Sequence, residues 1–333
     1  MKRLLAILTL ASLALCAGPA LAAQKFPTRP VQVLFPFGPS VTYSVSQVAG
    51  EALSQELGQP VSVTSTPGAG GVKAALTVMN KAADGYTIFD GYVAPLVLAP
   101  LSGNAKYSHK DFKPLYAVAS NAFALVCHKD ETRWDDLPGF LKYMKENPGK
   151  IVYSSGQDFT LRNLVIVAML KNEGVVGRKV TYQDATEMKD FLAKEFDVMV
   201  CNSGQYKTNK DSMRVLAVLS DQPSPEDGIP GPLPKDYGIS LGLSGLAAVG
   251  WNWWVVRSDT PDDVVQVLRE AMYRGMSNPE TRKKIEFMGF SPLSPDTYSP
   301  ESYDRICSDI TDQLTDAVGA IEWMNEQVAR LGM

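Results

Sequence analysis

Short apolar runs alternate along the chain with segments in which apolar residues recur every three to four positions. Residues 31–37 form a nearly continuous apolar run, which predicts a buried strand, and the spacing over 45–53 predicts an amphipathic helix. Because strands that alternate with helices pair in parallel through right-handed crossovers, the pattern predicts an α/β fold. The same alternation predicts strands over 61–64, 86–89, 151–154, 180–182, 197–201 and 215–219, and helices over 74–82, 134–147, 160–170, 187–193, 262–276, 279–288 and 300–331.

Chain length and two apolar runs divide this pattern into two lobes. The 333 residues exceed what one ordinary core accommodates. The long run over 117–128 predicts a strand that crosses between the lobes, and 250–256 predicts the strand that returns. We therefore expect a mostly parallel sheet flanked by helices in each lobe.

The first 22 residues have the layout of a secretory signal peptide. Lys2 and Arg3 precede an apolar run over 4–16, and Ala20-Leu21-Ala22 is an A-x-A cleavage site. A retained membrane anchor is the alternative, but the run is shorter than the about 20 residues that span a bilayer. We expect cleavage after Ala22 and an exported, soluble protein.

Composition excludes several classes of function. The formal net charge of −4 disfavours a nucleic-acid partner, and two histidines do not suffice for a His-rich metal site. Cleavage would leave Cys127, Cys201 and Cys307, an odd and widely spaced set. Three buried free thiols are favoured, and one disulfide pair stays an alternative.

Three predicted strands end in loops that open helices, at 36–44, 64–72 and 153–161. Ligands of open α/β sheets bind outside the carboxyl ends of the strands, so a cleft between the lobes is the expected site. Glycine-rich loops and helix N-termini present backbone N–H groups that bind anions. These loops contain no Lys or Arg before Lys73, which favours a carboxylate over a phosphate, although ordinary tight turns remain an alternative.

Catalytic motifs are absent. The chain lacks a P-loop and a G-x-S-x-G sequence, and His109 and His128 are the only classical general bases. Trp251 and Trp253 would share one face of a strand, either as core or as a stacking wall of the cleft. Arg162 is either a solvated helix residue or a partner for a second ligand carboxylate.

Several segments, taken in order, resemble one family. Pro67-Gly68-Ala69-Gly70-Gly71 and Ala83-Asp84-Gly85-Tyr86-Thr87 match its P-G-A-G-G and A-D-G-Y-T sequences. Further matching segments lie at 26–31, 58–61, 147–150, 153–156, 197–199, 260–261 and 278–280. Over nearly all of the mature chain, the sequence resembles the periplasmic substrate-binding receptors of tripartite tricarboxylate transporters, the Bug/TctC type.

The resemblance implies a two-lobed fold like the type II periplasmic binding proteins, with the ligand cleft between the lobes. It implies a signal peptide over 1–22, a first lobe of 23–118 plus 250–333, and a second lobe of 119–249. A periplasmic receptor of this type would bind a small organic carboxylate and deliver it to membrane permease subunits. No catalysis, cofactor, metal or nucleic acid is expected, and we expect a monomer.

The resemblance also implies which residues contact the ligand. The family's first loop has a double glycine and an aspartate, whereas this loop is one residue shorter and has Tyr43 at the aspartate position. The candidate ligand-binding residues are Phe37, Gly38, Pro39, Ser40, Thr42 and Tyr43 in the first loop, Pro67, Gly68, Ala69, Gly70 and Gly71 in the second, and Ser154, Ser155, Thr160, Arg162, Tyr182, Cys201 and Asn202 in the second lobe.

Two other functions stay open from sequence alone. A ligand sensor that signals to a different membrane partner would have the same fold and cleft. An α/β hydrolase-like enzyme is the weaker alternative, because no nucleophile and base are brought together by any motif.

Overall fold

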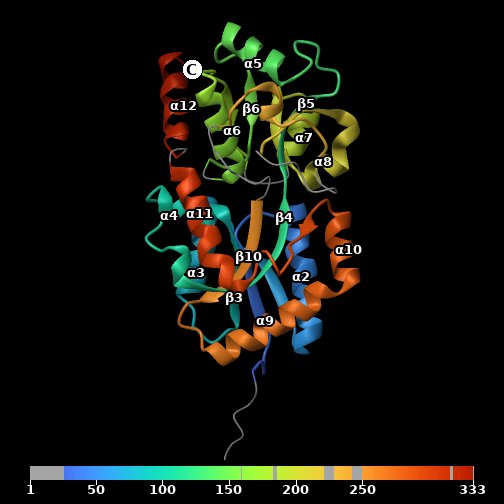
Figure 1. The fold of residues 1–333 in the computed structure, drawn as a ribbon, viewed down its shortest axis with the longest axis vertical. Helices are drawn as coiled ribbons and strands as arrows, with labels where there is room; N and C mark the ends of the chain where they lie inside the picture. The colour runs from blue at the N-terminus through green and yellow to red at the C-terminus, as the bar shows by residue number, and fades with distance from the viewer. Residues whose placement is uncertain are drawn as a thin grey trace, which may run out of the picture.

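The computed structural model describes residues 26–158, 160–182, 186–220, 229–241, 250–315 and 318–332. The predicted signal peptide over 1–22 lies outside these residues. Two β-sheets lie one above the other in Figure 1, each with helices against it. In the described part of the chain, no helix is both long enough and apolar enough to cross a membrane.

The first sheet has six strands, and its parallel part is β2-β1-β3. β10 pairs antiparallel with both β3 and β4, and β11 pairs antiparallel with β4. In spatial order the strands are β11 (Ser291–Pro292), β4 (Phe112–Asn121), β10 (Gly250–Arg257), β3 (Thr87–Tyr92), β1 (Val31–Phe35) and β2 (Val61–Ser65).

The second sheet has five strands, with β7-β6-β8 parallel and β5 antiparallel to both β8 and β9. In spatial order they are β7 (Arg178–Val180), β6 (Val152–Ser154), β8 (Val198–Asn202), β5 (Phe123–His128) and β9 (Met213–Val218). The expectation of mostly parallel sheets is therefore corrected to two mixed sheets. The reason is that β5 and β10 each enter their sheet from the other one, so they run against strands whose carboxyl ends face the cleft.

One apolar run was expected to form a single crossing strand over 117–128. The structure has two strands instead, β4 and β5, which belong to different sheets and are separated by Ala122. The run over 117–127 is otherwise apolar, and only the polar residues Ser120 and Asn121 precede the break. The chain therefore changes sheet at one residue.

Helices cover both sheets in Figure 1. The longest, α2, begins after its N-cap Ser40 and ends at Gly58, whose φ of 62° is left-handed. Around the first sheet lie α2 (Val41–Leu57), α3 (Val72–Met79), α4 (Ala99–Leu101), α9 (Asp262–Ser277) and α10 (Pro279–Phe287); around the second lie α5 (Leu137–Glu146), α6 (Leu161–Asn172), α7 (Thr186–Leu192) and α8 (Ser203–Asn209).

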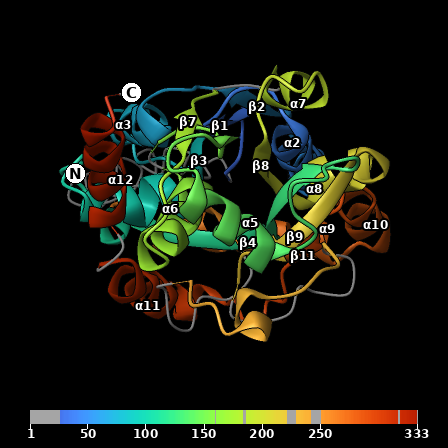
Figure 2. The same ribbon diagram turned by 90° about the horizontal axis from the view of Figure 1, so that it is seen from above.

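The C-terminal segment departs from the single helix expected over 300–331. It forms two helices, α11 (Tyr303–Thr315) and α12 (Gly319–Arg330). The second of them packs against α6, beside which it lies in Figures 1 and 2. The last helix of the chain thus contacts the half of the molecule that holds the second sheet.

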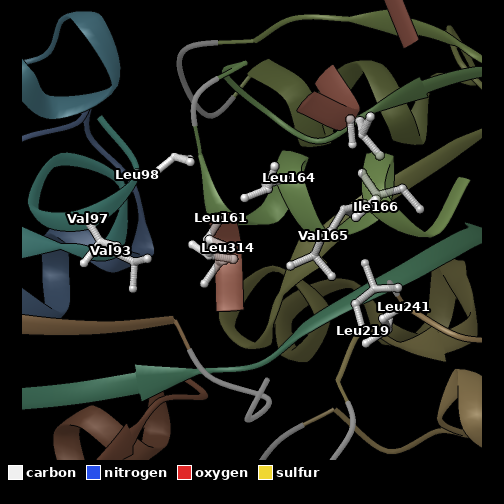
Figure 3. Packing of buried hydrophobic residues seen from close by; sticks show 14 of the residues in the cluster. Val93, Val97, Leu98, Leu161, Leu164, Val165, Ile166, Leu219, Leu241 and Leu314 are labelled. Carbon is white, nitrogen blue, oxygen red and sulfur yellow. The ribbon is translucent and has the colours of Figure 1, made fainter. Parts of the chain in front are cut away.

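One cluster of buried apolar side chains runs through both halves. Figure 3 shows Val93 and Val97, which follow β3, on one side of Leu161 and Leu314, and the buried side chains of α6 on the other. The same cluster includes Trp253 from the first sheet. The two halves are therefore joined by packed apolar contacts on the side where α11 lies.

Candidate functional site

A cavity of about 300 Å³ lies between the two sheets. Both halves of the molecule contribute to it, as expected for a cleft between lobes. Its lining consists of Phe37, Gly38, Pro39, Ser40, Val41, Thr42, Tyr92, Val93, Ala94, Phe123, Gln157, Thr160, Leu161, Arg162, Tyr182, Glu187, Met188, Asn202, Gln205, Thr208, Asn209, Gly250 and Trp251.

The loop after β1 and the N-terminus of α2 form the wall on the first-sheet side. The Ser40 hydroxyl caps the helix by accepting a hydrogen bond from the Tyr43 backbone N–H at 3.3 Å. The amides of Val41 and Thr42 lie in the first turn, where a helix has no carbonyl to pair with them. This end of α2 therefore offers backbone donors and a partial positive charge to the cavity.

A second helix N-terminus faces the cavity from the other half. α6 begins after Thr160, whose hydroxyl accepts a hydrogen bond from the Asn163 backbone N–H at 3.4 Å. Gln157, in the loop before α6, and Leu161, the first residue of α6, both line the cavity. The cavity thus lies between the positive ends of two helices of 17 and 12 residues.

Arg162 and Glu187 form an ion pair at the wall on the second-sheet side. The Arg162 Nη2 and Glu187 Oε2 atoms are 3.0 Å apart, and the two side chains are 17% and 2% exposed. Arg162 is therefore not the solvated helix residue of the first alternative. Its guanidinium already has a carboxylate partner within the protein, which the sequence alone did not predict.

Half of the candidate residues line the cavity. Those residues are Phe37, Gly38, Pro39, Ser40 and Thr42 on one side, and Thr160, Arg162, Tyr182 and Asn202 on the other. Their roles toward a ligand remain predictions.

The glycine-rich loop after β2 does not line the cavity. A Cβ on Gly71 would lie 3.0 Å from both Pro36 and Pro95, and the φ of Gly71 is +99°. The loop therefore packs closely behind the segments that do form the wall. This placement differs from the expectation for Pro67, Gly68, Ala69, Gly70 and Gly71, because the glycines serve a backbone turn and close packing.

Tyr43 also points away from the cavity. Its hydroxyl donates a hydrogen bond to the Val63 carbonyl at 2.8 Å, and its ring packs against Phe35. Tyr43 therefore fastens α2 to the edge of the first sheet. Where the family's first loop has an aspartate, this chain therefore has a side chain that packs against the first sheet.

Three further candidates lie behind the wall of the second half. Ser154 donates a hydrogen bond to Glu187 Oε1 at 2.5 Å, and Ser155 donates to Asn163 Oδ1 at 2.7 Å. Cys201 is fully buried, and burial raises the pKa of its thiol to about 12. Ser154 thus holds the lining residue Glu187 in position, and none of the three side chains lines the cavity.

Sequence reasoning missed several lining residues. Glu187, Met188, Phe123 and Tyr92 have no motif around them, because strands and loops that are distant in sequence meet only after folding. The capping sequence that begins at Asn202 could have indicated other lining residues. The Asn202 side chain accepts a hydrogen bond from the Gln205 backbone N–H at 2.9 Å, and α8 continues from there to Thr208 and Asn209, which line the cavity.

The tryptophans of β10 serve both as core residues and as part of the cavity wall. Trp253 and Trp254 are completely buried and lie in the apolar clusters on opposite faces of the first sheet. Trp251 is 1% exposed and also lines the cavity. The same strand therefore supplies core residues and two wall residues, Gly250 and Trp251.

A buried carboxyl group lies behind the wall. Asp90 on β3 is 0% exposed; it accepts hydrogen bonds from the Ser46 hydroxyl and from Asn252 Nδ2, the latter at 2.8 Å. Burial raises the pKa of Asp90 from 3.8 to about 7. Burial, together with the Asp90 charge, also raises the pKa of the lining residue Tyr92 well above 10.

The two halves touch beside the cavity. A Cβ on Gly204, at the start of α8, would lie 2.9 Å from Val41 Cγ1 and 3.0 Å from the Met288 carbonyl oxygen. Lys207 of α8 donates a hydrogen bond to the Glu286 carbonyl at 2.8 Å. The lack of a side chain at Gly204 leaves room for this close approach of α8 to α2.

Groups for catalysis or metal binding are not gathered at the cavity. His109 pairs with Asp304 at 2.8 Å, and His128 bonds the Phe196 carbonyl at 2.9 Å, both away from the lining. Over the residues that the structure describes, no three His, Cys, Asp or Glu side chains are grouped to hold a metal ion. The three cysteines described, Cys127, Cys201 and Cys307, are free and buried, as favoured from the sequence.

Comparison with known proteins identifies the family. Residues 45–318 match the model of the tripartite tricarboxylate transporter family receptor, TctC. The chain belongs to this family. The match confirms the family that the sequence resembles. Because members of this family are substrate-binding receptors and not enzymes, it also confirms that no enzymatic role is expected. A relative is a UPF0065 protein of Bordetella pertussis, 26% identical over 278 residues, which cover 82% of this receptor and 84% of the relative.

Solved structures confirm the fold of the receptor. MatC from Rhodopseudomonas palustris with bound malate superposes with a TM-score of 0.76 at 19% identity, over 88% of this chain and all of that one. A second R. palustris protein, with adipate, gives 0.76 at 19% identity over 89% and 98%. The periplasmic binding protein BugD gives 0.73 at 20% identity over 91% and 98%. These likenesses support the two-lobed fold of periplasmic binding proteins.

Proposed function

We propose that this protein is an extracytoplasmic solute receptor that binds a small carboxylated metabolite in the cavity between its two sheets. The observation that carries the proposal is that the N-termini of α2 and α6 meet at this cavity from opposite halves. Such helix ends stabilise a carboxylate through backbone N–H donors without a lysine or arginine. Relatives of the same fold hold malate and adipate.

The ligand would be delivered to the membrane permease subunits of a tripartite transporter. Membership of the receptor family supports this partner. The receptor would act as a monomer in the periplasm after removal of the signal peptide at 1–22. A strain without this protein, tested for uptake of the acid that binds in vitro, should lose that uptake, whereas unchanged uptake would favour the sensing role.

We also retain the division into a first lobe of 23–118 plus 250–333 and a second lobe of 119–249. The sheets support its outline, since β1 to β4 with β10 and β11 form one and β5 to β9 the other. β4 ends at Asn121, three residues past the proposed boundary at 118. α12 would then be an extension of the first lobe that packs onto α6 of the second.

Binding is tested by thermal unfolding of the mature chain with a panel of carboxylates and, as a control, sugars and amines. Saturation at 100 times Kd should stabilise the folded state by about 2.7 kcal/mol. At least one carboxylate should raise Tm in a concentration-dependent way, and the controls should not. A panel of aliphatic and aromatic acids that leaves Tm unchanged would refute the ligand class.

A further inference from the structure

The charged side chains of the cavity wall compensate each other. Among the lining residues that the structure describes, Arg162 and Glu187 alone carry charge, one positive and one negative. They are paired at 3.0 Å, and both are largely withdrawn from solvent. A ligand that enters therefore finds no excess positive side-chain charge in this lining.

Both members of the pair make further hydrogen bonds within the protein. Glu187 Oε1 accepts from the Ser154 hydroxyl at 2.5 Å and from the Gly156 N–H at 2.9 Å. Arg162 Nη1 donates to the Val200 carbonyl at 3.1 Å and to Gln205 Oε1 at 3.4 Å. A second ligand carboxylate would compete with Glu187 for the guanidinium, and displacement of Glu187 would leave a buried carboxylate without its counter-charge.

The backbone fixes the guanidinium in this place. Gly156 has a φ of +72°, and a Cβ there would lie 1.9 Å from Arg162 Nη2. The guanidinium thus lies directly against the glycine Cα, at the point where the Gly156 N–H bonds Glu187. The pair, with Arg162 on α6 and Glu187 on α7, thus packs against the loop after β6, which contributes the Gly156 N–H to Glu187.

The remaining wall is rich in aromatic and aliphatic side chains. Phe37 and Tyr92 stack edge to face, with ring centroids 5.2 Å apart. Trp251 and Phe123 come from strands of the two different sheets, and Met188 from α7. Such a lining favours a ligand with an apolar body and a small number of polar contacts.

We propose that the ligand is a monocarboxylate whose remaining body is uncharged and largely apolar, and that the Arg162–Glu187 pair selects against a second carboxylate. The inference rests on the proposed function, in which one carboxylate is held at the cavity. Within that function, it assigns the specificity between mono- and dicarboxylates to one compensated ion pair.

Matched ligands test the inference on the unmodified mature protein. Hexanoate against adipate, and benzoate against terephthalate, differ only in the second carboxylate. In calorimetric titrations, the monocarboxylate of the pair that fits should bind at least tenfold tighter than its dicarboxylate. A dicarboxylate that binds as tightly or more tightly overturns the inference while it supports a carboxylate receptor; binding of sugars or amines in place of all acids refutes the proposed function itself.

Glu187→Gln tests the pair directly. The glutamine oxygen can keep the bonds from Ser154 and Gly156, and its amide no longer neutralises Arg162. Affinity for the dicarboxylate should rise at least tenfold relative to the monocarboxylate. Glu195→Gln, which removes the same charge from an exposed position, should leave the ratio unchanged.

An unchanged ratio in folded E187Q would refute the role of the pair. Circular dichroism and urea unfolding show whether the variant is folded. The comparison of matched ligands on the unmodified protein does not depend on any variant, so it decides the substrate class even if E187Q does not fold.

Discussion

The buried carboxyl group of Asp90 should make the stability of this receptor depend on pH, and Asp90→Asn should remove that dependence. Asp90 is 0% exposed on β3, between the Ser46 hydroxyl and the Asn252 amide. An asparagine has nearly the same shape, and its oxygen and amide can pair with Asn252 and Ser46. The substitution therefore removes the titration with little change in packing.

The sign follows from the direction of the pKa change. Burial raises the pKa of Asp90 to about 7, whereas the ordinary value is 3.8. Between these two values the folded state holds a proton that the unfolded chain has released, so stability falls as pH rises through this window. At about 1.4 kcal/mol per pH unit, the window corresponds to about 4 kcal/mol.

Urea unfolding followed by tryptophan fluorescence at pH 4, 5.5, 7 and 8 measures the effect. The free energy of unfolding of D90N, relative to the unmodified protein, should increase by about 4 kcal/mol from pH 4 to pH 8. Asp312→Asn, at an exposed position, serves as the control for the loss of one acid. A difference between D90N and the unmodified protein that stays constant with pH would refute the buried protonated carboxyl.

Two further predictions concern the thiols and the contact between the lobes. Ellman's reagent should label none of Cys127, Cys201 and Cys307 in the folded mature protein, because burial raises the pKa of each thiol. All three should be labelled after denaturation, and fewer than three labelled thiols in the denatured protein would reveal a disulfide. Gly204→Val should weaken ligand affinity at least tenfold, because its side chain would collide with Val41 of α2 beside the cavity. Gly319→Ala, which has open space around it, should bind the ligand normally. Equal affinities of the two variants in calorimetric titrations would contradict a role of the α8–α2 contact in binding.

Local sequence patterns predicted the elements around the cavity better than the contacts across it. The apolar run before Gly38 and the helical spacing after it placed the β1–α2 turn, since strand, cap and amphipathic helix are each encoded within a few residues. The same holds for Thr160 at the start of α6. The break at Ala122 was not predicted, because Ser120 and Asn121 are the only polar residues in an otherwise apolar run over 117–127.

Long-range pairing explains what the sequence did not predict at the site. Arg162 was expected to be either solvated or paired with a ligand carboxylate, but Glu187 lies on another helix and pairs with it only in the folded chain. The loop over 67–71 was predicted to contact the ligand, whereas its Gly71 lies against Pro36 and Pro95. A glycine-rich loop indicates an unusual backbone, and only the structure shows whether a ligand or a neighbouring segment makes use of it.

The central claim is that a carboxylate is held at the N-terminus of α2 inside the cavity between the sheets. A crystal structure of the mature protein with the acid that gives the largest rise in Tm tests this most directly. The carboxylate oxygens should lie within hydrogen-bond distance of the Val41 or Thr42 backbone N–H, with the Arg162–Glu187 pair intact. A carboxylate bound to Arg162 with Glu187 displaced, or a ligand bound outside the cavity, would contradict the account.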